Sequence, residues 1–247
     1  MSAVEFQNVS KIFHRHTGKL LLRHRLKQLF TTEGGEPFYA LKNVSFRMEQ
    51  GESLAVIGAN GAGKSTLLGL AAGLALPDEG IVSVRGRVAA LLELGSGFHP
   101  DLTGEENVRL NASLIGLSRK RINEISDEIV EFSGIGDFIR EPLRTYSTGM
   151  VMRLGFSVAV TMDPEILLVD EVLAVGDAAF QTKCFDKVRE FRRRGKMLLC
   201  VSHSPWMIRE LCDQAIWLDH GEVVMSGTVA DVMEAYADQP ATAAATV

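Results

Sequence analysis

The sequence predicts an α/β fold with a mostly parallel sheet flanked by helices, an inserted helical subdomain and antiparallel strands near the N-terminus. Three short apolar segments, SLAVIG, ILLVD and KMLLCVS, are typical of buried strands. They alternate with segments of helical periodicity, and 178–194 is the clearest because its apolar residues recur on one face. Those residues are Phe180, Cys184, Val188 and Phe191. Strands that alternate with helices favour a parallel sheet covered on both faces.

The composition is that of a globular chain and disfavours several other classes of protein. Its 247 residues are 46% hydrophobic and 23% charged, which is enough to bury a sizeable core. The net charge of -5 argues against nucleic acid as a partner, since such proteins usually carry a basic surface. The three cysteines include no CxxC pair, and we expect Cys184, Cys200 and Cys212 to be small buried residues in a reducing compartment.

Neither a secretory leader nor a membrane span is expected. The first residues, MSAVEFQNVSKIF, lack the basic and apolar regions of a signal peptide. No apolar run approaches the length needed to cross a bilayer. If the chain powers transport, we expect other chains to supply the membrane part.

The first strands are predicted from alternation. Residues 3–13 alternate, with Val4, Phe6 and Val9 on one side, and we expect a pair of strands there. A further strand, ALKNVSFRM, follows Tyr39 and leads through a turn to the apolar strand SLAVIG.

The stretch 15–36 separates these strands and differs in composition, with five basic residues against two acidic ones. Its apolar residues at helical spacing predict a short amphipathic helix that ends in a Gly-rich turn. They are Leu22, Leu26, Leu29 and Phe30. Either the insert packs its apolar stripe on the core and exposes its charges, or it approaches anionic headgroups or a membrane subunit.

The middle of the chain predicts one core helix and then a helical subdomain at 98–162. The core helix runs from about Lys64 to Leu74 and stops before Pro77, and short strands follow around 81–94.

Within the subdomain, Thr103 and Glu106 have the spacing of a capping box at a helix start. The next helix presents an apolar inner face, and a third begins near Thr148. The inner face consists of Ile122, Ile125 and Ile129.

The C-terminal part returns to the α/β pattern. AIWLD and EVVMSG predict a hairpin around His220 and Gly221, and VADVMEAYA predicts the last helix. We therefore expect one domain over residues 1–237 and a disordered tail at 238–247.

The segment GANGAGKST, residues 58–66, has the form GxxxxGK[ST] between an apolar strand and an apolar helix. Small residues let the backbone wrap a phosphate chain with its N–H groups pointing inward, and the helix start adds a positive dipole end. Lys64 would reach the β- and γ-phosphates and Ser65 would ligate Mg²⁺. The whole loop is expected to bind the nucleotide: Gly58, Ala59, Asn60, Gly61, Ala62, Gly63, Lys64, Ser65 and Thr66.

A second acidic site fits this loop. ILLVDE places Asp170 and Glu171 at the end of a buried strand. Asp170 is positioned to hold the magnesium ion, as the acid after a second apolar strand does in P-loop NTPases. Glu171 is then placed to polarise the attacking water.

Three further motifs resemble those of ABC ATPases. YSTGM, residues 146–150, followed by VMRLGFSVAV, resembles the signature sequence of that family. VSHS puts His203 where the family has its switch histidine. DEVLAVGD puts Asp177 where the family has the acidic residue of the loop that crosses between subunits. Because the motifs follow in the family's order, the resemblance covers nearly the whole chain and implies the ABC ATPase fold.

The resemblance also implies a shared site. In this family two ATPase subunits face head to tail, so a second copy of the chain would cover the bound ATP and its Mg²⁺ with Ser147, Thr148 and Gly149. The helix that starts there would present its N-terminal amides to the γ-phosphate. ATP would then favour the closed dimer and hydrolysis would release it.

Longer stretches resemble the ATP-binding subunits of bacterial polysaccharide exporters, the O-antigen, capsule and teichoic-acid group. LLELGSGFHPDLTGEEN, TYSTGM and DEVLAVGD carry this likeness. The usual signature has Gly and Gln at the positions of Thr148 and Met150, and Glu93 stands near the expected glutamine. Glu93 is therefore either a magnesium or coupling ligand or an ordinary loop acid.

An aromatic residue of the first strands stacks on adenine in this family. Phe13 matches that position best, and Tyr39 is the alternative. The expected partners are a second copy and integral-membrane transporter subunits, on the cytoplasmic face of the bacterial inner membrane.

Other functions remain as alternatives. The chain could serve an ABC exporter of another substrate, such as a lipid or a drug. A soluble ABC protein of DNA repair is disfavoured because no heptad run separates Lys64 from Asp170. A GTPase is disfavoured because no NKxD-type guanine-reading segment occurs.

Overall fold

A computed structural model describes residues 2–14, 37–92, 94–95, 97–114, 116–170 and 176–239. The expected basic helix at 15–36 lies outside the described residues, as do Glu93 and Glu171. Of the expected tail, only residues 238–239 are described.

The main sheet is mostly parallel, as predicted. Its strand order is β5-β6-β7-β3-β8-β9, and each neighbouring pair is parallel except the β8–β9 hairpin. These strands are β3 (Ser53–Ile57), β5 (Val88–Ala90), β6 (Ile166–Val169), β7 (Met197–Val201), β8 (Gln214–Asp219) and β9 (Glu222–Thr228). All residues of β3, β6 and β7 are buried, which explains why their sequences are continuously apolar.

A smaller antiparallel sheet has the order β2-β1-β4. Its strands are β1 (Ser2–His14), β2 (Pro37–Glu49) and β4 (Glu79–Val84). The prediction of a strand pair within 3–13 was wrong, because β1 is one strand that pairs with β2 and β4. Asn8 takes a positive φ of 50°, and the register with β2 shifts between Phe6 and Val9, so the chain makes a bulge there instead of a turn.

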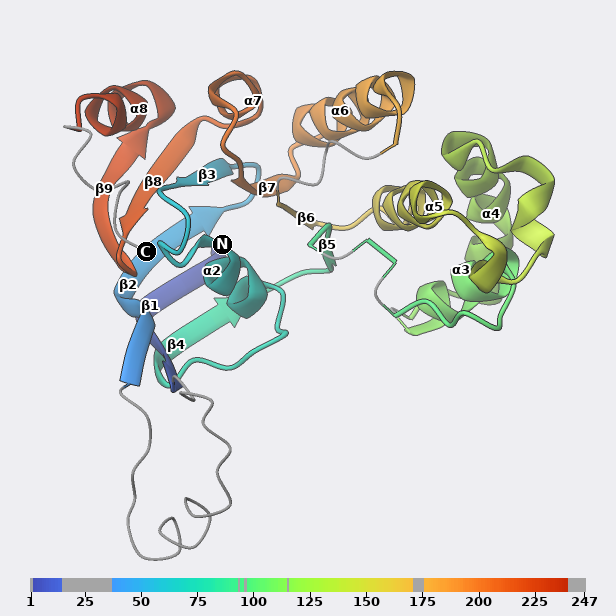
Figure 1. The fold of residues 1–247 in the computed structure, drawn as a ribbon, viewed down its shortest axis with the longest axis horizontal. Coiled ribbons are helices and arrows are strands. Elements are labelled where there is room, and N and C mark those ends of the chain that lie inside the picture. Colours follow the sequence, from blue (N-terminus) through green and yellow to red (C-terminus); the bar gives the residue numbers. More distant parts are fainter. Residues whose placement is uncertain are drawn as a thin grey trace, which may run out of the picture.

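Two apolar layers cover the two faces of the main sheet (Figure 1). On one face, Ala55 and Ile57 of β3 belong to a core with α6 (Ala178–Arg193), α7 (Pro205–Leu211) and α8 (Val229–Ala237). On the other face, Leu54 and Val56 belong to a core with α2 (Lys64–Ala71) and the smaller sheet. Because successive side chains of a strand point to opposite faces, each buried strand supplies both cores.

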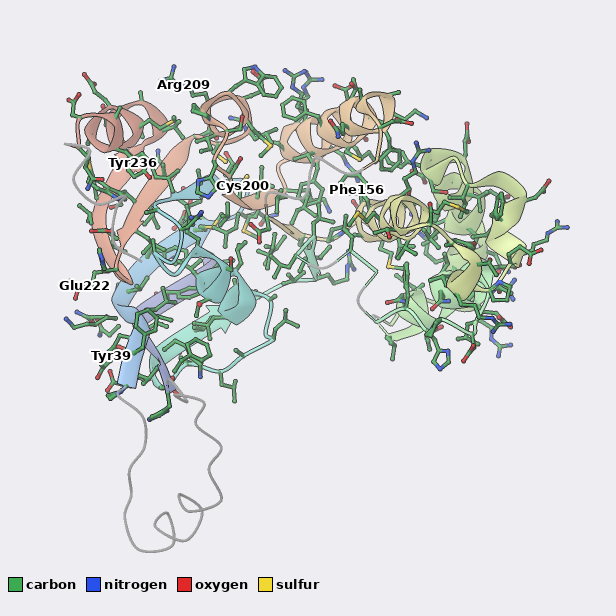
Figure 2. The ribbon with its side chains drawn as sticks, in the orientation of Figure 1. Tyr39, Phe156, Cys200, Arg209, Glu222 and Tyr236 are labelled. Atoms are coloured by element: carbon green, nitrogen blue, oxygen red, sulfur yellow. The ribbon has the colours of Figure 1, made fainter. Side chains whose placement is uncertain are left out.

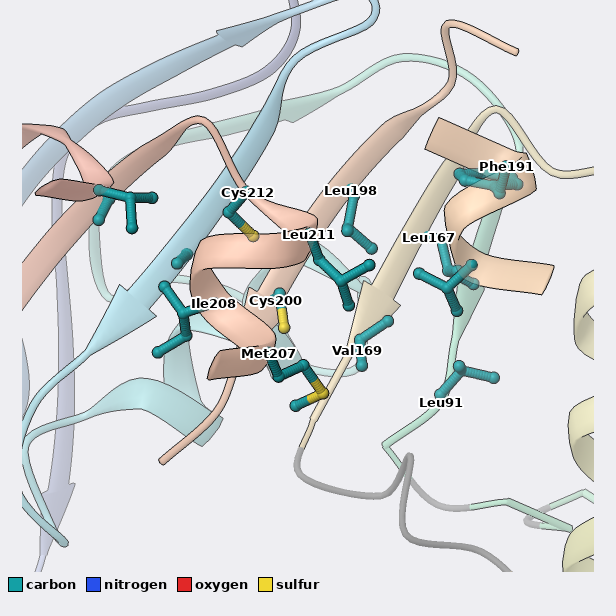
Figure 3. Close-up of a cluster of buried hydrophobic side chains, with 14 of the residues drawn as sticks. Leu91, Leu167, Val169, Phe191, Leu198, Cys200, Met207, Ile208, Leu211 and Cys212 are labelled. Atoms are coloured by element: carbon teal, nitrogen blue, oxygen red, sulfur yellow. The ribbon is translucent and has the colours of Figure 1, made fainter. Parts of the chain in front are cut away.

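The three cysteines are buried, as expected, and lie in the first of these cores. Figure 3 shows Cys200 of β7 and Cys212 beside α7, in the same apolar cluster as Met207 and Leu211. Burial raises the pKa of the Cys184 thiol to about 12, so that side chain behaves as a small apolar residue.

The helices of the middle segment gather at one end of the molecule (Figure 1). They are α3 (Gly104–Leu114), α4 (Arg119–Ser133) and α5 (Thr148–Thr161), and they share a third core. Ile122, Ile125 and Ile129 are buried in it, as their spacing predicts. The predicted capping box is also confirmed: the Thr103 N–H donates to Glu106 Oε2 at 2.8 Å, and the Glu106 N–H donates to Thr103 Oγ1 at 3.2 Å.

The parallel strands β3, β6 and β7 end at the same edge of the main sheet. Their carboxyl ends lead into the loop 58–66, Asp170 and His203, respectively. A crevice outside the carboxyl ends of parallel strands is where ligands bind in open α/β sheets.

Candidate functional site

The loop 58–66 is shaped by glycines that no other residue can replace without strain. Gly58 has φ 150° and Gly63 has φ 106°, which are conformations that favour glycine. A Cβ on Gly58 would overlap the carbonyl oxygen of Leu218. A Cβ on Gly63 would overlap the carbonyl oxygen of Ala40 and lie 2.8 Å from Leu41 Cδ2. The loop is therefore pressed against β8 on one side and β2 on the other.

Lys64 lies inside this loop and is only 7% exposed. Its ammonium group donates to the carbonyl oxygens of Gly58 at 2.8 Å and Ala59 at 2.9 Å. A buried ammonium needs such partners because burial of an unpaired charge is costly. These bonds fix the positive charge beside the start of α2, whose N-cap, Gly63, supplies no side-chain cap. Cation and helix start together favour an anion at this place.

One pocket of about 540 Å³ collects most of the predicted nucleotide site. It brings the loop together with Asp170 from the end of β6, His203 from the end of β7 and Phe13 from β1. Its lining is Phe13, Phe38, Ala40, Asn60, Gly61, Gly63, Lys64, Ser65, Thr66, Asp170, Val201 and His203. Residues more than 130 positions apart, such as Lys64 and His203, therefore face the same cavity.

Phe38 also lines this pocket, although no sequence motif pointed to it. Tyr39, the alternative to Phe13, does not line it. Within β2 the side chains of Phe38 and Ala40 share one face, and Tyr39 points to the other. The alternation of Phe38 with Ala40 was the available signal, but it does not indicate which face meets the loop.

The predicted signature residues lie elsewhere: Ser147, Thr148 and Gly149 do not line the pocket. Ser147 is the N-cap of α5, and its Oγ accepts a hydrogen bond from the Met150 N–H at 3.2 Å. A Cβ on Gly149 would meet only Ser147 Oγ at 3.8 Å, which is ordinary contact. Packing among the described residues therefore does not require glycine at this position.

Asp177 is also absent from the pocket lining and has partners within the chain. Its Oδ1 accepts from the Phe180 N–H at 2.9 Å and caps α6, and its Oδ2 pairs with Arg153 of α5 at 2.6 Å. The Phe180 N–H, and then Arg153, hold the pKa of this carboxyl below its usual value. Arg153 also lies over the Phe180 ring, 5.0 Å from its centre. These contacts join the start of α6 to α5.

The described part of the chain contains neither a metal-binding cluster nor a helix that could span a membrane. No group of three or more His, Cys, Asp or Glu side chains gathers there to hold a metal. Within the same residues, every helix is too short or too polar to cross a membrane.

Comparison with known proteins places this geometry in a family. The ABC transporter family model matches residues 41–174, which include the loop 58–66 and Asp170. An O-antigen export system ATP-binding protein, RfbB of Klebsiella pneumoniae, is 46% identical over 94% of this chain and 96% of its own length. A teichoic acids export ATP-binding protein, TagH of Bacillus anthracis, is 40% identical over 94% of this chain and 42% of its own length.

Solved structures share the fold at low sequence identity. The ATP-binding cassette MJ0796, solved as a dimer in a post-hydrolysis state bound to ADP and Pi, has a TM-score of 0.73 at 23% identity. That match covers 92% of this chain and 98% of the other. The ATP-binding subunit of another ABC transporter has a TM-score of 0.76 at 23% identity, over 95% and 93% of the two chains. The family match, the close relatives and the loop geometry agree, and the chain belongs to the ABC transporter family.

Proposed function

We propose that this chain is the ATP-binding and ATP-hydrolysing subunit that powers export of a polysaccharide across the bacterial inner membrane. The observation that carries the ATPase is the pocket that joins the loop 58–66 to Asp170 and His203. The polysaccharide, an O-antigen or a related cell-surface glycan, is supported by relatives named for O-antigen and teichoic acid export. The alternative within the family is an exporter of another substrate.

The phosphate chain of ATP is bound by the loop. Backbone N–H groups of the loop would donate to it, and the uncapped start of α2 adds its partial positive charge. Lys64 exchanges its bonds to the Gly58 and Ala59 carbonyls for phosphate oxygens, which are stronger partners for a cation.

Ser65 and Asp170 fit a magnesium site. Both line the pocket beside Lys64, and they offer a hydroxyl and a carboxylate oxygen. Mg²⁺ usually takes one or two protein oxygens and completes its shell with phosphate oxygens and water, so no larger acidic cluster is needed. When bound, it would neutralise charge on the β- and γ-phosphates. Glu93 as a further ligand remains a prediction outside the described residues.

Two residues carry the proposed chemistry of hydrolysis. Glu171, which follows Asp170 in the sequence, orients the attacking water and accepts its proton. His203, which lines the pocket, contacts the γ-phosphate and holds it in place for attack. The assignment of Glu171 rests on its place after β6, because it lies outside the described residues.

A second copy of the chain completes the site. Ser147, Thr148 and Gly149 do not line the pocket of their own chain, yet they form the start of α5, where an anion would be favoured. We place the partner's Ser147–Gly149 segment over the outer phosphate, with Asp177 near the junction of the two copies. The dimeric form of the related MJ0796 cassette supports this arrangement.

The remaining partners are integral-membrane transporter subunits, which hold the chain at the cytoplasmic face of the inner membrane. Binding of ATP closes the two copies and hydrolysis opens them, and the membrane subunits convert that motion into export.

The ATPase is tested with Glu171→Gln and Lys64→Ala. We expect Glu171→Gln to bind Mg-ATP but not to turn it over, so that light scattering after gel filtration reports a stable dimer. Lys64→Ala should lose Mg-ATP binding and remain folded. Full turnover by Glu171→Gln would contradict the role of Glu171, and unchanged nucleotide binding by Lys64→Ala would contradict the whole site.

The substrate is tested in cells that lack the chromosomal copy of this chain. We expect their surface polysaccharide to disappear and to return with the wild-type chain but not with Lys64→Ala. Unchanged surface polysaccharide in the deletion strain would refute export of a glycan and favour another substrate.

A further inference from the structure

The ends of β1 and β2 place two phenylalanines beside each other at the mouth of the nucleotide pocket. Phe13 and Phe38 are direct partners across the antiparallel pair, so their side chains project from the same face of the sheet. Both line the pocket with Asn60 and Gly61 of the loop. They are 49% and 41% exposed, a large exposure for two neighbouring phenylalanines.

An irregularity in the β1–β2 ladder selects Phe38 for this face. Lys11 pairs with Leu41, and the next residue, Ile12, pairs with Tyr39, so the register shifts by one residue between them. A regular ladder would have put Tyr39 opposite Phe13. Because a slip of one residue moves a side chain to the other face, the bulge turns Phe38 toward the pocket and Tyr39 away from it. Figure 2 labels Tyr39 near the lower end of the smaller sheet.

Phe38 is held at a fixed place relative to the phosphate loop. Two residues along the strand, the Ala40 carbonyl touches Gly63 so closely that no Cβ fits between them. The turn between β8 and β9 also connects the loop to β2. The Gly221 N–H donates to the Ala62 carbonyl of the loop at 3.0 Å, and the Lys42 N–H of β2 donates to the Gly221 carbonyl at 2.8 Å. The loop, the turn and β2 are therefore in direct contact with one another.

Asp78, which directly precedes β4, anchors the end of β1 next to Phe13. Its carboxylate accepts from the Ile12 N–H at 2.6 Å and pairs with the Lys11 ammonium at 3.1 Å. That ammonium lies 5.7 Å from the centre of the Phe13 ring. The end of β1 is thus fastened next to the ring that faces the pocket.

We propose that Phe38 shares the nucleobase with Phe13, so that the base of the bound nucleotide packs against both rings. This inference rests on the proposed function, in which the loop binds the phosphates, and it adds a residue to the base-binding end of the same site. Every nucleobase has a π-face, and stacking of a base on an aromatic side chain is favourable without hydrogen bonds to the base edge. A purine covers more of two adjacent rings than a pyrimidine does, so the pair favours purine nucleotides.

The test compares Mg-ATP with inorganic tripolyphosphate, which has the phosphates but no base. Dissociation constants are measured by calorimetry on the full chain for wild type, Phe38→Ala, Phe38→Trp and Tyr39→Ala. We expect Phe38→Ala to weaken Mg-ATP by about 5-fold or more and to leave tripolyphosphate unchanged. Phe38→Trp should keep or improve Mg-ATP binding. Tyr39→Ala is the matched control. It removes the adjacent aromatic ring, which does not line the pocket, and should change neither dissociation constant.

Three results would overturn the role of Phe38: unchanged Mg-ATP binding in Phe38→Ala, an equal loss in Tyr39→Ala, or an equal loss of tripolyphosphate, which would indicate a disturbed loop. If Phe38→Ala does not fold, the test uses Phe38→Trp and compares the dissociation constants of Mg-ATP and Mg-CTP. A changed ratio of the two constants would support contact between residue 38 and the base, and an unchanged ratio would contradict it. Failure of wild type to bind tripolyphosphate and Mg-ATP would instead refute the proposed function itself.

Discussion

The phosphate loop and the start of α5 are both glycine-containing motifs, but they differ in what their own chain demands of them. In the loop, Gly58 and Gly63 are pressed against backbone carbonyls, and Lys64 is bonded within the loop. At the start of α5, Gly149 has room for a Cβ. Packing within one chain therefore explains Gly58 and Gly63 of the loop but not Gly149, which we assign to the proposed contact with a second copy.

The largest difference in stability is expected between alanine substitutions at two glycines of the loop. Gly63→Ala adds a Cβ where a carbonyl oxygen already lies, at a positive φ, so we expect a loss of at least about 2 kcal/mol of unfolding free energy and of ATP binding. Gly61→Ala is the matched control, since its φ is 83° but nothing lies within 4 Å of its Cβ. It should cost only about 1 kcal/mol. Urea unfolding measures both, and equal losses would contradict the packing argument.

The next largest effect is expected for Ser147→Ala. The loss of an N-cap costs about 1 kcal/mol. The ATPase should fall as well, because in the proposed dimer Ser147 faces the partner's nucleotide. Ser118→Ala removes the N-cap of α4, whose Oγ accepts from the Arg121 N–H at 3.3 Å. This control should lose similar stability but no ATPase. If both variants kept equal ATPase activity, Ser147 would be only a helix cap.

Gly149→Ala should affect stability least and still stop turnover. Its Cβ meets no close neighbour, so the unfolding free energy should change by less than about 1 kcal/mol. Gly155→Ala, in the same helix, should be destabilising because its Cβ would lie 2.8 Å from the Gly95 backbone nitrogen. Thermal unfolding and ATPase assays on both variants separate the two effects. A strongly destabilised Gly149→Ala would remove the contrast between the two motifs.

A smaller effect concerns acid stability at the junction of α5 and α6. The Phe180 N–H and Arg153 hold the pKa of Asp177 below its usual 3.8, so the carboxylate form is favoured in the folded chain. Its stabilising contribution is present above pH 3.8 and is lost as the pH falls through the lower folded-state value. Asp177→Asn should therefore lower the melting temperature at pH 7 and narrow the gap to wild type near pH 3. An unchanged gap across this range would contradict the assignment.

Local sequence patterns were sufficient for the strands and the loop. Continuous apolar runs predicted β3, β6 and β7. The phosphate-loop motif led us to expect Asp170 beside Lys64, and the resemblance to ABC ATPases added His203; one pocket holds all three. The end of α2 was placed too late, at Leu74, because Gly73 with φ 72° ends the helix before Pro77 is reached.

The strand register and the contacts between distant segments could not be predicted from the sequence. The bulge at Asn8 turned an expected strand pair into one strand, and the shift after Lys11 brought Phe38 to the pocket in place of Tyr39. Neither shift has a Gly or Pro to mark it, since β1 and the described start of β2 contain no glycine and only Pro37 at the strand end. The partners of Asp177 come from α5 and α6, far apart in sequence, so a capping and ion-pairing role was not visible either.

The central claim is that each nucleotide lies between the loop of one copy and the start of α5 of another. It is tested most directly by mixing two inactive variants, Lys64→Ala and Gly149→Asp, under conditions in which copies exchange. A mixed dimer then has one site with an intact loop from the Gly149→Asp chain and an intact α5 start from the Lys64→Ala chain. We predict that the mixture hydrolyses ATP although neither variant does so alone. A mixture that forms mixed dimers and stays as inactive as its components would contradict the account.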